Sequence, residues 1–231
     1  MDWSPLIPTV LGGAISLVSS ITVMAIATSL ERKRRIRDER TQSALAAYSG
    51  LHKLTGTANQ VINLAKHLDK EFEKFSTSSA KFAEPSSFVR TAVGAPFAIS
   101  DLTPEEMVFL SKGDGELIAR IGEVQHRAKN NEYIFREYGR LRSEFDVFLA
   151  ENAEIIENNP DGSKGIEISG MAGRTAEMKQ AQLNQLLAGL IESIEEDRIS
   201  VVDVVKRFID EARIEFGDLF PVKHFEFRDV S

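Results

Sequence analysis

The feature that most constrains this sequence is an uncharged run of 25 residues near its beginning, residues 6–30. As an α-helix with a rise of ~1.5 Å per residue, the run would be roughly 38 Å long. That length exceeds the ~30 Å hydrocarbon core of a bilayer and allows some tilt. A soluble helix of this length normally carries charged residues on its solvent face, and this run has none. We therefore predict that residues 1–30 are an N-terminal transmembrane anchor, with a span from Leu6 to Leu30 and Trp3 at the headgroups.

A basic segment follows the uncharged run directly. Residues 31–40 contain six basic and three acidic side chains. The basic residues are Arg32, Lys33, Arg34, Arg35, Arg37 and Arg40. Because basic residues beside a span resist translocation, we predict that residues 31–43 are a polybasic juxtamembrane segment, with the N-terminus outside and all later residues in the cytoplasm. These cations either contact anionic lipid headgroups or act only as a stop-transfer signal.

Two alternatives concern the same run. A cleaved secretory signal would use the small residues Ala25 and Ala27, but residues 1–5 lack Lys and Arg, the run is long, and the basic segment follows at once. Small residues also recur along one face of the run, which leaves open the association of several spans into an effector that perturbs the bilayer. They are Gly12, Ser16, Ser20, Val23 and Ala27.

An apolar heptad pattern continues beyond the basic segment. Every a and d position is apolar through Ala44, Ala47, Leu51, Leu54, Ala58, Val61, Ala65, Leu68, Phe72 and Phe75. No proline interrupts the pattern, so it predicts one long, coiled-coil-like helix. The pattern does not decide whether this seam packs within one chain or between copies. We expect a homo-oligomer, with the larger seam residues at the contact: Leu51, Leu54, Val61, Leu68, Phe72 and Phe75.

The rest of the chain predicts shorter helices separated by loops at about 76–102 and 158–173. Thr103 and Pro104 begin a short helix that ends near Lys112, and Asp114 caps a helix that reaches about Asn152. Two more helices are expected over 175–197 and 200–216, and the tail 220–231 is either a short strand or extended chain. The predicted fold is all-α: a transmembrane helix, a long helix, and an antiparallel helical bundle within a cytoplasmic helical domain, residues 44–231.

We find no catalytic motif and predict neither a metal nor a cofactor. The absence of cysteine excludes disulfides, thiolate metal sites and cysteine nucleophiles. Glu123 and His126 have the spacing of di-iron bundle sites, but no second copy follows. Nucleophile-elbow, Walker and kinase motifs are also absent. Enzymes built on bundles place polar residues inside the apolar stripes, which here are mostly apolar, so an enzyme without a recognisable motif stays an alternative to a protein that is not an enzyme.

One polar pattern suggests a binding surface. Lys129, Tyr133, Arg136 and Arg140 recur along one side of a helix, with His126 one turn earlier. Such a stripe binds phosphates or an acidic helix, and residues 151–231, with seventeen acidic and nine basic side chains, are the nearest acidic candidate. A chain of net charge −7 is a poor match for DNA, so nucleic acid is not an expected partner. The predicted function is a single-pass, membrane-anchored scaffold or adaptor that associates with an unidentified protein.

Overall fold

The computed structural model describes residues 6–76, 84–90, 99–158 and 164–222, and gives side chains for residues 23–74, 84–90, 99–154 and 167–222. Four α-helices dominate the described chain: α1 (Leu6–Ser76), α2 (Pro104–Met107), α3 (Gly115–Asn152) and α4 (Gly170–Phe216). Short 3-10 helices η1 (Pro85–Ser87), η2 (Val108–Lys112) and η3 (Gly217–Leu219) lie between and after them. The predicted helical bundle is confirmed. Trp3 and residues 223–231 of the tail lie outside the described residues.

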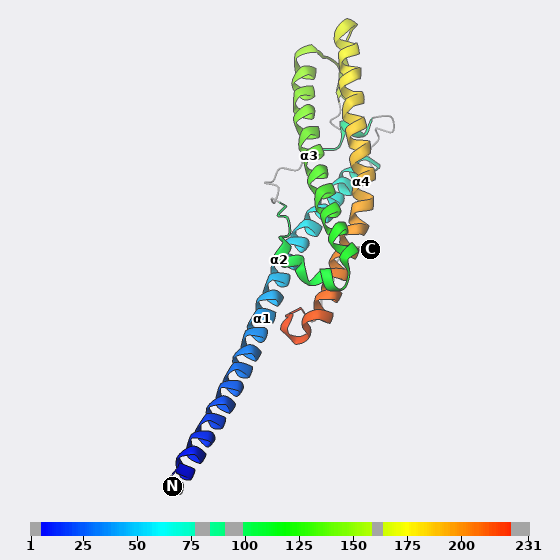
Figure 1. The fold of residues 1–231 in the computed structure, drawn as a ribbon. Coiled ribbons are helices and arrows are strands. Elements are labelled where there is room, and N and C mark those ends of the chain that lie inside the picture. The colour runs from blue at the N-terminus through cyan, green and yellow to red at the C-terminus, as the bar shows by residue number, and fades with distance from the viewer. Residues whose placement is uncertain (1–5, 77–83, 91–98, 159–163, 223–231) are drawn as a thin grey trace.

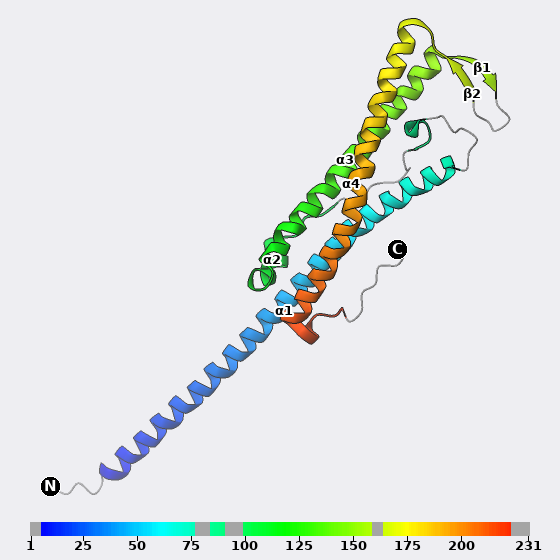
Figure 2. The same cartoon turned by 90° about the vertical axis from the view of Figure 1, so that its right-hand side faces the viewer.

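The bundle consists of the second part of α1 together with α3 and α4 (Figures 1 and 2). Both α1 and α3 pack mainly on α4. One core cluster joins the earlier part of α1 and α3 to the end of α4, and the other joins their later parts to its beginning. Thus α4 is antiparallel to α1 and α3, as predicted, but α1 and α3 are parallel to each other. The connection over residues 77–103 is long because it joins the end of α1 to the start of α2 at the opposite end of the bundle. We call that end, where α4 finishes, the base of the bundle.

The first part of α1 projects from the bundle as a single helix (Figure 2). All residues from 23 to 42 are exposed, so no other described element covers this segment. Among the residues that the structure describes, no helix combines the length and apolar character needed to cross a membrane. Leu6 begins α1, but the side chains of residues 6–22 lie outside the described part.

The heptad seam packs inside the chain's own bundle. Eight of its positions are buried against α3, α4 or the segments that dock on them: Ala44, Ala47, Leu51, Leu54, Ala58, Val61, Ala65 and Leu68. Phe72 is partly buried in the same core, and the side chain of Phe75 is not described. The seam was expected to join copies of the chain. It is instead filled from within, because α4 supplies a matching apolar stripe.

Two further expectations need correction. The helices predicted over 175–197 and 200–216 are one helix, α4, because neither glycine nor proline interrupts the chain between them. The loop predicted over 158–173 is bounded by an antiparallel hairpin of β1 (Glu154–Asn158) and β2 (Lys164–Glu167), in which Ile155 pairs with Ile166. The short helix before Lys112 and the end of α3 at Asn152 are confirmed.

Candidate functional site

The exposed segment of α1, residues 23–42, begins with apolar side chains that have no protein partner among the described residues. Val23 is 67% exposed and Met24 is 71% exposed, and Ile26 and Leu30 are also exposed. Val23, Ile26 and Leu30 are three and four residues apart and share one face of α1, and Met24 lies about 100° from Val23. A helical stretch with such an apolar face and no charged side chain over residues 23–30 normally packs on a protein core or lies in a membrane. This segment has no core around it.

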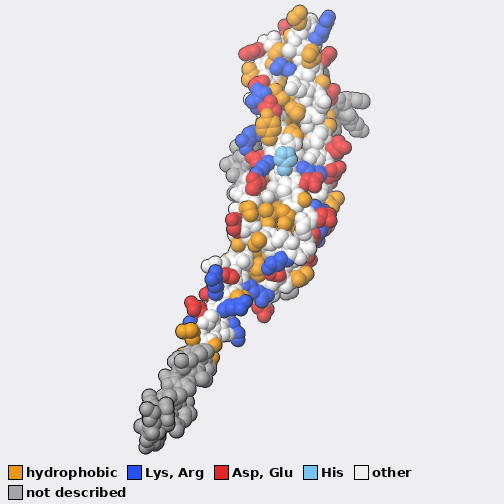
Figure 3. Space-filling view, in the orientation of Figure 1, with side chains coloured by type: hydrophobic (Ala, Val, Ile, Leu, Met, Phe, Trp, Pro, Cys, Tyr) orange, Lys and Arg blue, Asp and Glu red, His pale blue; other side chains and the backbone are white. Residues whose placement is uncertain are grey.

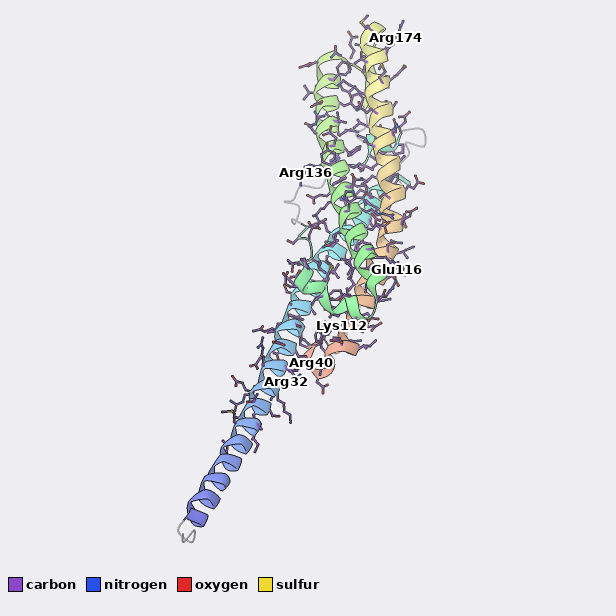
Figure 4. All side chains as sticks on the ribbon, viewed as in Figure 1. Arg32, Arg40, Lys112, Glu116, Arg136 and Arg174 are labelled. Atoms are coloured by element: carbon purple, nitrogen blue, oxygen red, sulfur yellow. The ribbon has the colours of Figure 1, made fainter. Side chains whose placement is uncertain are left out.

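The basic residues that follow are also exposed. In the described part of the chain, four of them form no ion pair: Arg32, Lys33, Arg34 and Arg37. We call these four residues the collar. Arg35 pairs with Glu39 at 2.9 Å. Figure 3 shows basic side chains on the narrow stem next to the undescribed segment, and Figure 4 places Arg32 below Arg40, on the part of α1 that projects from the bundle.

Arg40 marks the point where α1 enters the bundle. Its Nη2 donates to the backbone carbonyl of Glu215 at 2.7 Å, in the last turn of α4. The unpaired carbonyls at a helix C-terminus carry partial negative charge, so a guanidinium is favourable there. Arg40 is therefore a structural contact at the base of the bundle, whereas the four collar residues remain exposed.

The basic stripe on α3 is neutralised by nearby acids. Lys129 Nζ lies 2.5 Å from Asp101 Oδ2, and Arg140 Nη2 lies 2.5 Å from Glu137 Oε1. Arg136 pairs with Glu132, one turn earlier on the same helix. The acids come from α3 itself and the preceding loop, and not from residues 151–231 as proposed from the sequence. Tyr133 is 66% exposed beside them.

A buried polar cluster lies between the two parts of the core. It consists of Arg127 and Asn131 on α3 and Asp197 on α4. Asn131 Nδ2 donates to Asp197 Oδ2 at 2.6 Å, and Arg127 Nε lies 2.6 Å from Asp197 Oδ1 at an ion-pair distance. Asn131 and Asp197 are each 1% exposed. Asn131 Oδ1 has no hydrogen-bond partner among the described residues.

The cluster changes the acidity of Asp197. Burial raises the pKa of its carboxyl, and the charge of Arg127 and the hydrogen bond from Asn131 offset only part of that effect. Arg127 also bonds to Glu196 at 2.7 Å, on the exposed side of α4. Arg127, Asn131 and Asp197 therefore each bond to or pair with a side chain of the facing helix, which suits a structural contact that holds α3 and α4 in register.

A second buried acid fastens the short helix α2 to α1. Glu106 accepts hydrogen bonds from Ser49 Oγ at 2.8 Å and Lys53 Nζ at 2.9 Å. It also accepts from the backbone N–H of Thr103 at 2.8 Å, which completes the capping box at the start of α2. Burial alone would raise the pKa of Glu106, but these three bonds outweigh it and hold the pKa below its ordinary value.

Polar residues of α3 also fasten the long connection that returns to the base. The Tyr138 hydroxyl donates to the carbonyl of Val89 at 2.8 Å, and Arg142 donates to the carbonyl of Ser86. Nearer the base, Gln125 Nε2 donates to the carbonyl of Ser100 at 2.9 Å. The described parts of this connection are therefore held against the bundle by buried or half-buried side chains.

Sequence reasoning missed these polar contacts, although the signal for the central cluster was present. Asp197 falls between Ile194 and Val201 in the apolar stripe of α4, and Asn131 continues the stripe of α3 after Ala128. A polar residue at such a position is buried and needs a partner. The sequence predicted stripes that are mostly apolar. Asn131 and Asp197 are polar exceptions in two of these stripes, and in the structure they bond to each other.

The comparisons with known proteins give no relative. No protein family matches the chain, and no similar protein was found among curated proteins or solved structures. Within the described ranges, no group of three or more histidine, aspartate and glutamate side chains is placed to hold a metal ion. Glu123 and His126, the pair with di-iron spacing, therefore belong to no such group among the described residues.

Proposed function

We propose that this chain is a single-pass membrane protein whose helical bundle acts as a scaffold or adaptor on the cytoplasmic side. The observation that carries the proposal is the exposed segment of α1. An isolated helix in water is only marginally stable, since most helical stability in proteins comes from packing of an apolar face. Here exposed apolar side chains lie on a part of α1 that no described element covers, and lipid would supply the missing environment.

The uncharged run that leads into the exposed segment also favours a lipid environment. Residues 6–30 contain no charged side chain, and α1 is continuous from Leu6 through this run. At ~1.5 Å per residue the run is long enough for a ~30 Å hydrocarbon core. The basic residues after Leu30 favour the cytoplasm for the bundle, by the positive-inside rule.

The contacts inside the bundle favour a binding role over a chemical one. The polar cluster, Glu106 and Tyr138 each use their polar groups to hold helices and connecting segments together. None of these contacts leaves a nucleophile beside a base, which is the arrangement that nucleophilic catalysis requires. We therefore assign the bundle to protein association, with an unidentified protein or a second copy of this chain as partner. A second copy would have to use the outer faces, because the seam is filled.

Insertion is tested with a pair of matched double variants in reconstituted vesicles. Val23→Glu with Ile26→Glu places two charges in the apolar part of the exposed segment. Val147→Glu with Ile199→Glu makes the same change at exposed apolar positions of the bundle. We expect the wild-type chain and the bundle variant to float with the vesicles and resist alkaline carbonate, and the α1 variant to be partly extracted. Wild-type chain that carbonate extracts fully would contradict the proposal.

Sidedness and self-association need two further measurements. Protease added to spheroplasts should leave the region beyond Arg40 intact, and digestion there would place the bundle on the other side. Light scattering on the detergent-solubilised chain reports the number of copies. A strict monomer would limit the scaffold to partners other than itself.

A further inference from the structure

The collar gathers four cations that have no ion pair within the described chain into six consecutive residues. In the bundle most cations meet acids: Arg120 lies 3.0 Å from Asp203, and Lys129 lies 2.5 Å from Asp101. Arg207 pairs with Asp114, which also caps α3. Described cations of the bundle that meet no acid, such as Lys70 and Lys206, stand apart from one another. The collar has acids nearby in sequence, yet within the described chain none pairs with its four members. Four such charges close together attract counter-charge from outside the protein.

The positions of the collar residues suit a helix that passes through a layer of anions. Since successive positions differ by about 100°, Arg32, Lys33 and Arg34 alone cover about 200° of the helix circumference. A helix lying flat on a membrane carries its cations on one face opposite an apolar face. The collar instead extends over more than half of the circumference, as suits a helix that crosses the headgroup layer.

The distance of the collar from Leu30 along α1 agrees with a position in the headgroup layer. Its residues lie ~3 to ~10 Å beyond Leu30 at ~1.5 Å per residue. The headgroup layer on each side of a bilayer is roughly 5–8 Å thick. Arg40, which bonds to the end of α4, lies ~15 Å beyond Leu30 and so marks where the bundle starts.

Charge on the bundle favours the collar as the point of contact. The chain is net negative although residues 31–43 are net basic, so the negative charge resides in the bundle. Its end nearest the collar carries the exposed Asp218. Glu215 and Asp210 lie there as well and pair with Lys112 and Arg213. An anionic surface repels the net negative bundle and attracts the collar.

We infer that the collar, Arg32, Lys33, Arg34 and Arg37, binds the headgroup phosphates of acidic phospholipids around α1. This inference rests on the proposed membrane insertion and names the lipid class that the inserted helix prefers. Acidic lipids would gather around the helix on the side of the bundle, and the collar would fix how deeply α1 sits.

The test measures lipid preference around the full chain. The protein has no cysteine, so Gln42→Cys, in the exposed segment beyond the collar, gives a single attachment point. The chain is reconstituted in phosphatidylcholine vesicles, and outward-facing copies are labelled with an impermeant donor dye. Energy transfer is then compared for trace acceptor-labelled phosphatidylglycerol and acceptor-labelled phosphatidylcholine. We expect stronger transfer to phosphatidylglycerol, and a smaller difference at high salt.

Two double variants of equal charge change isolate the collar. Arg34→Gln with Arg37→Gln should reduce the preference about fivefold for each cation, roughly 25-fold together. Arg136→Gln with Arg140→Gln removes two cations that are paired on α3, and should leave the preference unchanged. Equal transfer to both lipids in the wild-type chain, or equal loss in both variants, would overturn the inference.

Flotation in phosphatidylcholine alone separates the two proposals. A chain that fails to float disproves membrane insertion, whereas one that floats without lipid preference disproves only the collar inference and leaves a stop-transfer role. A short duplex DNA that binds the wild-type chain but not the collar variant, without any lipid preference, would assign the cations to nucleic acid and overturn the inference as well.

Discussion

The two parts of α1 belong to one continuous helix and have opposite surroundings. Over residues 23–42 every side chain is exposed, and the collar cations lack acidic partners within the described chain. From Ala44 onward, seam residues at helical spacing are buried by α4 and α3, and Lys53 is paired with Glu106. The change occurs near Arg40, which touches the last turn of α4.

The difference shows which part of the helix the chain stabilises by itself. The packed part, residues 44–72, is stabilised by apolar burial and by hydrogen bonds to other elements of the bundle. Before Arg40 the exposed segment has neither source among the described residues, and its apolar side chains in water oppose stability. Its environment must come from outside the bundle, and that requirement leads to both proposals above.

The largest effect on the free energy of unfolding is expected when one aspartate of the bundle is replaced and the result is compared with the same change in the exposed segment. Asp197→Ala removes the charge that Arg127 and Asn131 face inside the bundle, and breaking a buried pair costs about 3–5 kcal/mol. Asp38→Ala, in the exposed segment, should change the free energy of unfolding by less than about 0.5 kcal/mol. Chemical unfolding of the full chain in detergent, followed by circular dichroism, measures both.

A triple variant tests whether Asp197 acts through its cluster. Replacing Arg127, Asn131 and Asp197 together by leucine removes the unpaired groups, so this variant should be more stable than Asp197→Ala. Equal destabilisation by the single and triple variants would show that side-chain volume, and not the uncompensated charge, determines the loss.

The next comparison uses the same substitution at two leucines of α1. Leu54 is 0% exposed and Leu30 is 55% exposed. Leu54→Ala leaves a cavity in the core and should lower the free energy of unfolding by about 2–5 kcal/mol. Leu30→Ala should leave it within about 0.5 kcal/mol. If Leu54→Ala instead split an oligomer without weakening the monomer, the seam would join copies of the chain after all; light scattering separates the two results.

Most of the helices could be predicted from the sequence because their signals are local. The apolar period of the seam, the capping residues Thr103 and Asp114 and the glycine after Lys112 define helices through their nearest neighbours. The continuity of α4 was missed because Asp197 and Ser200 resemble a helix end when considered alone. In the structure Asp197 bonds to Asn131, sixty-six residues away along the chain.

In the candidate site, too, features with a local signal could be predicted from the sequence, and contacts between distant residues could not. The collar was identified from the sequence because consecutive basic residues need no partner to be recognised. The stripe of Lys129, Arg136 and Arg140 was also identified, but its neutralisation depends on the rotamers of Glu132 and Glu137 and on where Asp101 lies. The direction of α3 relative to α1 depends on the path of a long connection, for which the sequence has no local signal.

A smaller effect is expected from the clamp between α2 and the packed part of α1. Because Glu106 has a lowered pKa, its bonds stabilise the fold above the ordinary carboxyl range near ~4.3, and this stabilisation is lost as the pH falls through the lowered pKa. Glu106→Gln should cost about 1–3 kcal/mol at neutral pH. The difference between wild type and variant should shrink in acid, as measured by unfolding across pH. A difference that grew in acid would contradict the sign of this pKa shift.

The smallest effects come from two glycines in the packed part of α1, where the same change should have opposite signs. A Cβ on Gly50 would meet Glu106 Cβ at 3.1 Å, Phe208 Cζ at 3.3 Å and Leu102 Cδ2 at 3.4 Å, whereas a Cβ on Gly56 would meet nothing within 4 Å. Gly56→Ala should raise the free energy of unfolding by up to about 1 kcal/mol, since alanine favours the helix. Gly50→Ala gains the same preference but crowds three neighbours that are buried together, so it should lower stability by about 1 kcal/mol. Thermal unfolding of both variants resolves this difference. A stabilising Gly50→Ala would mean that α2 and α4 approach α1 less closely than the structure has them.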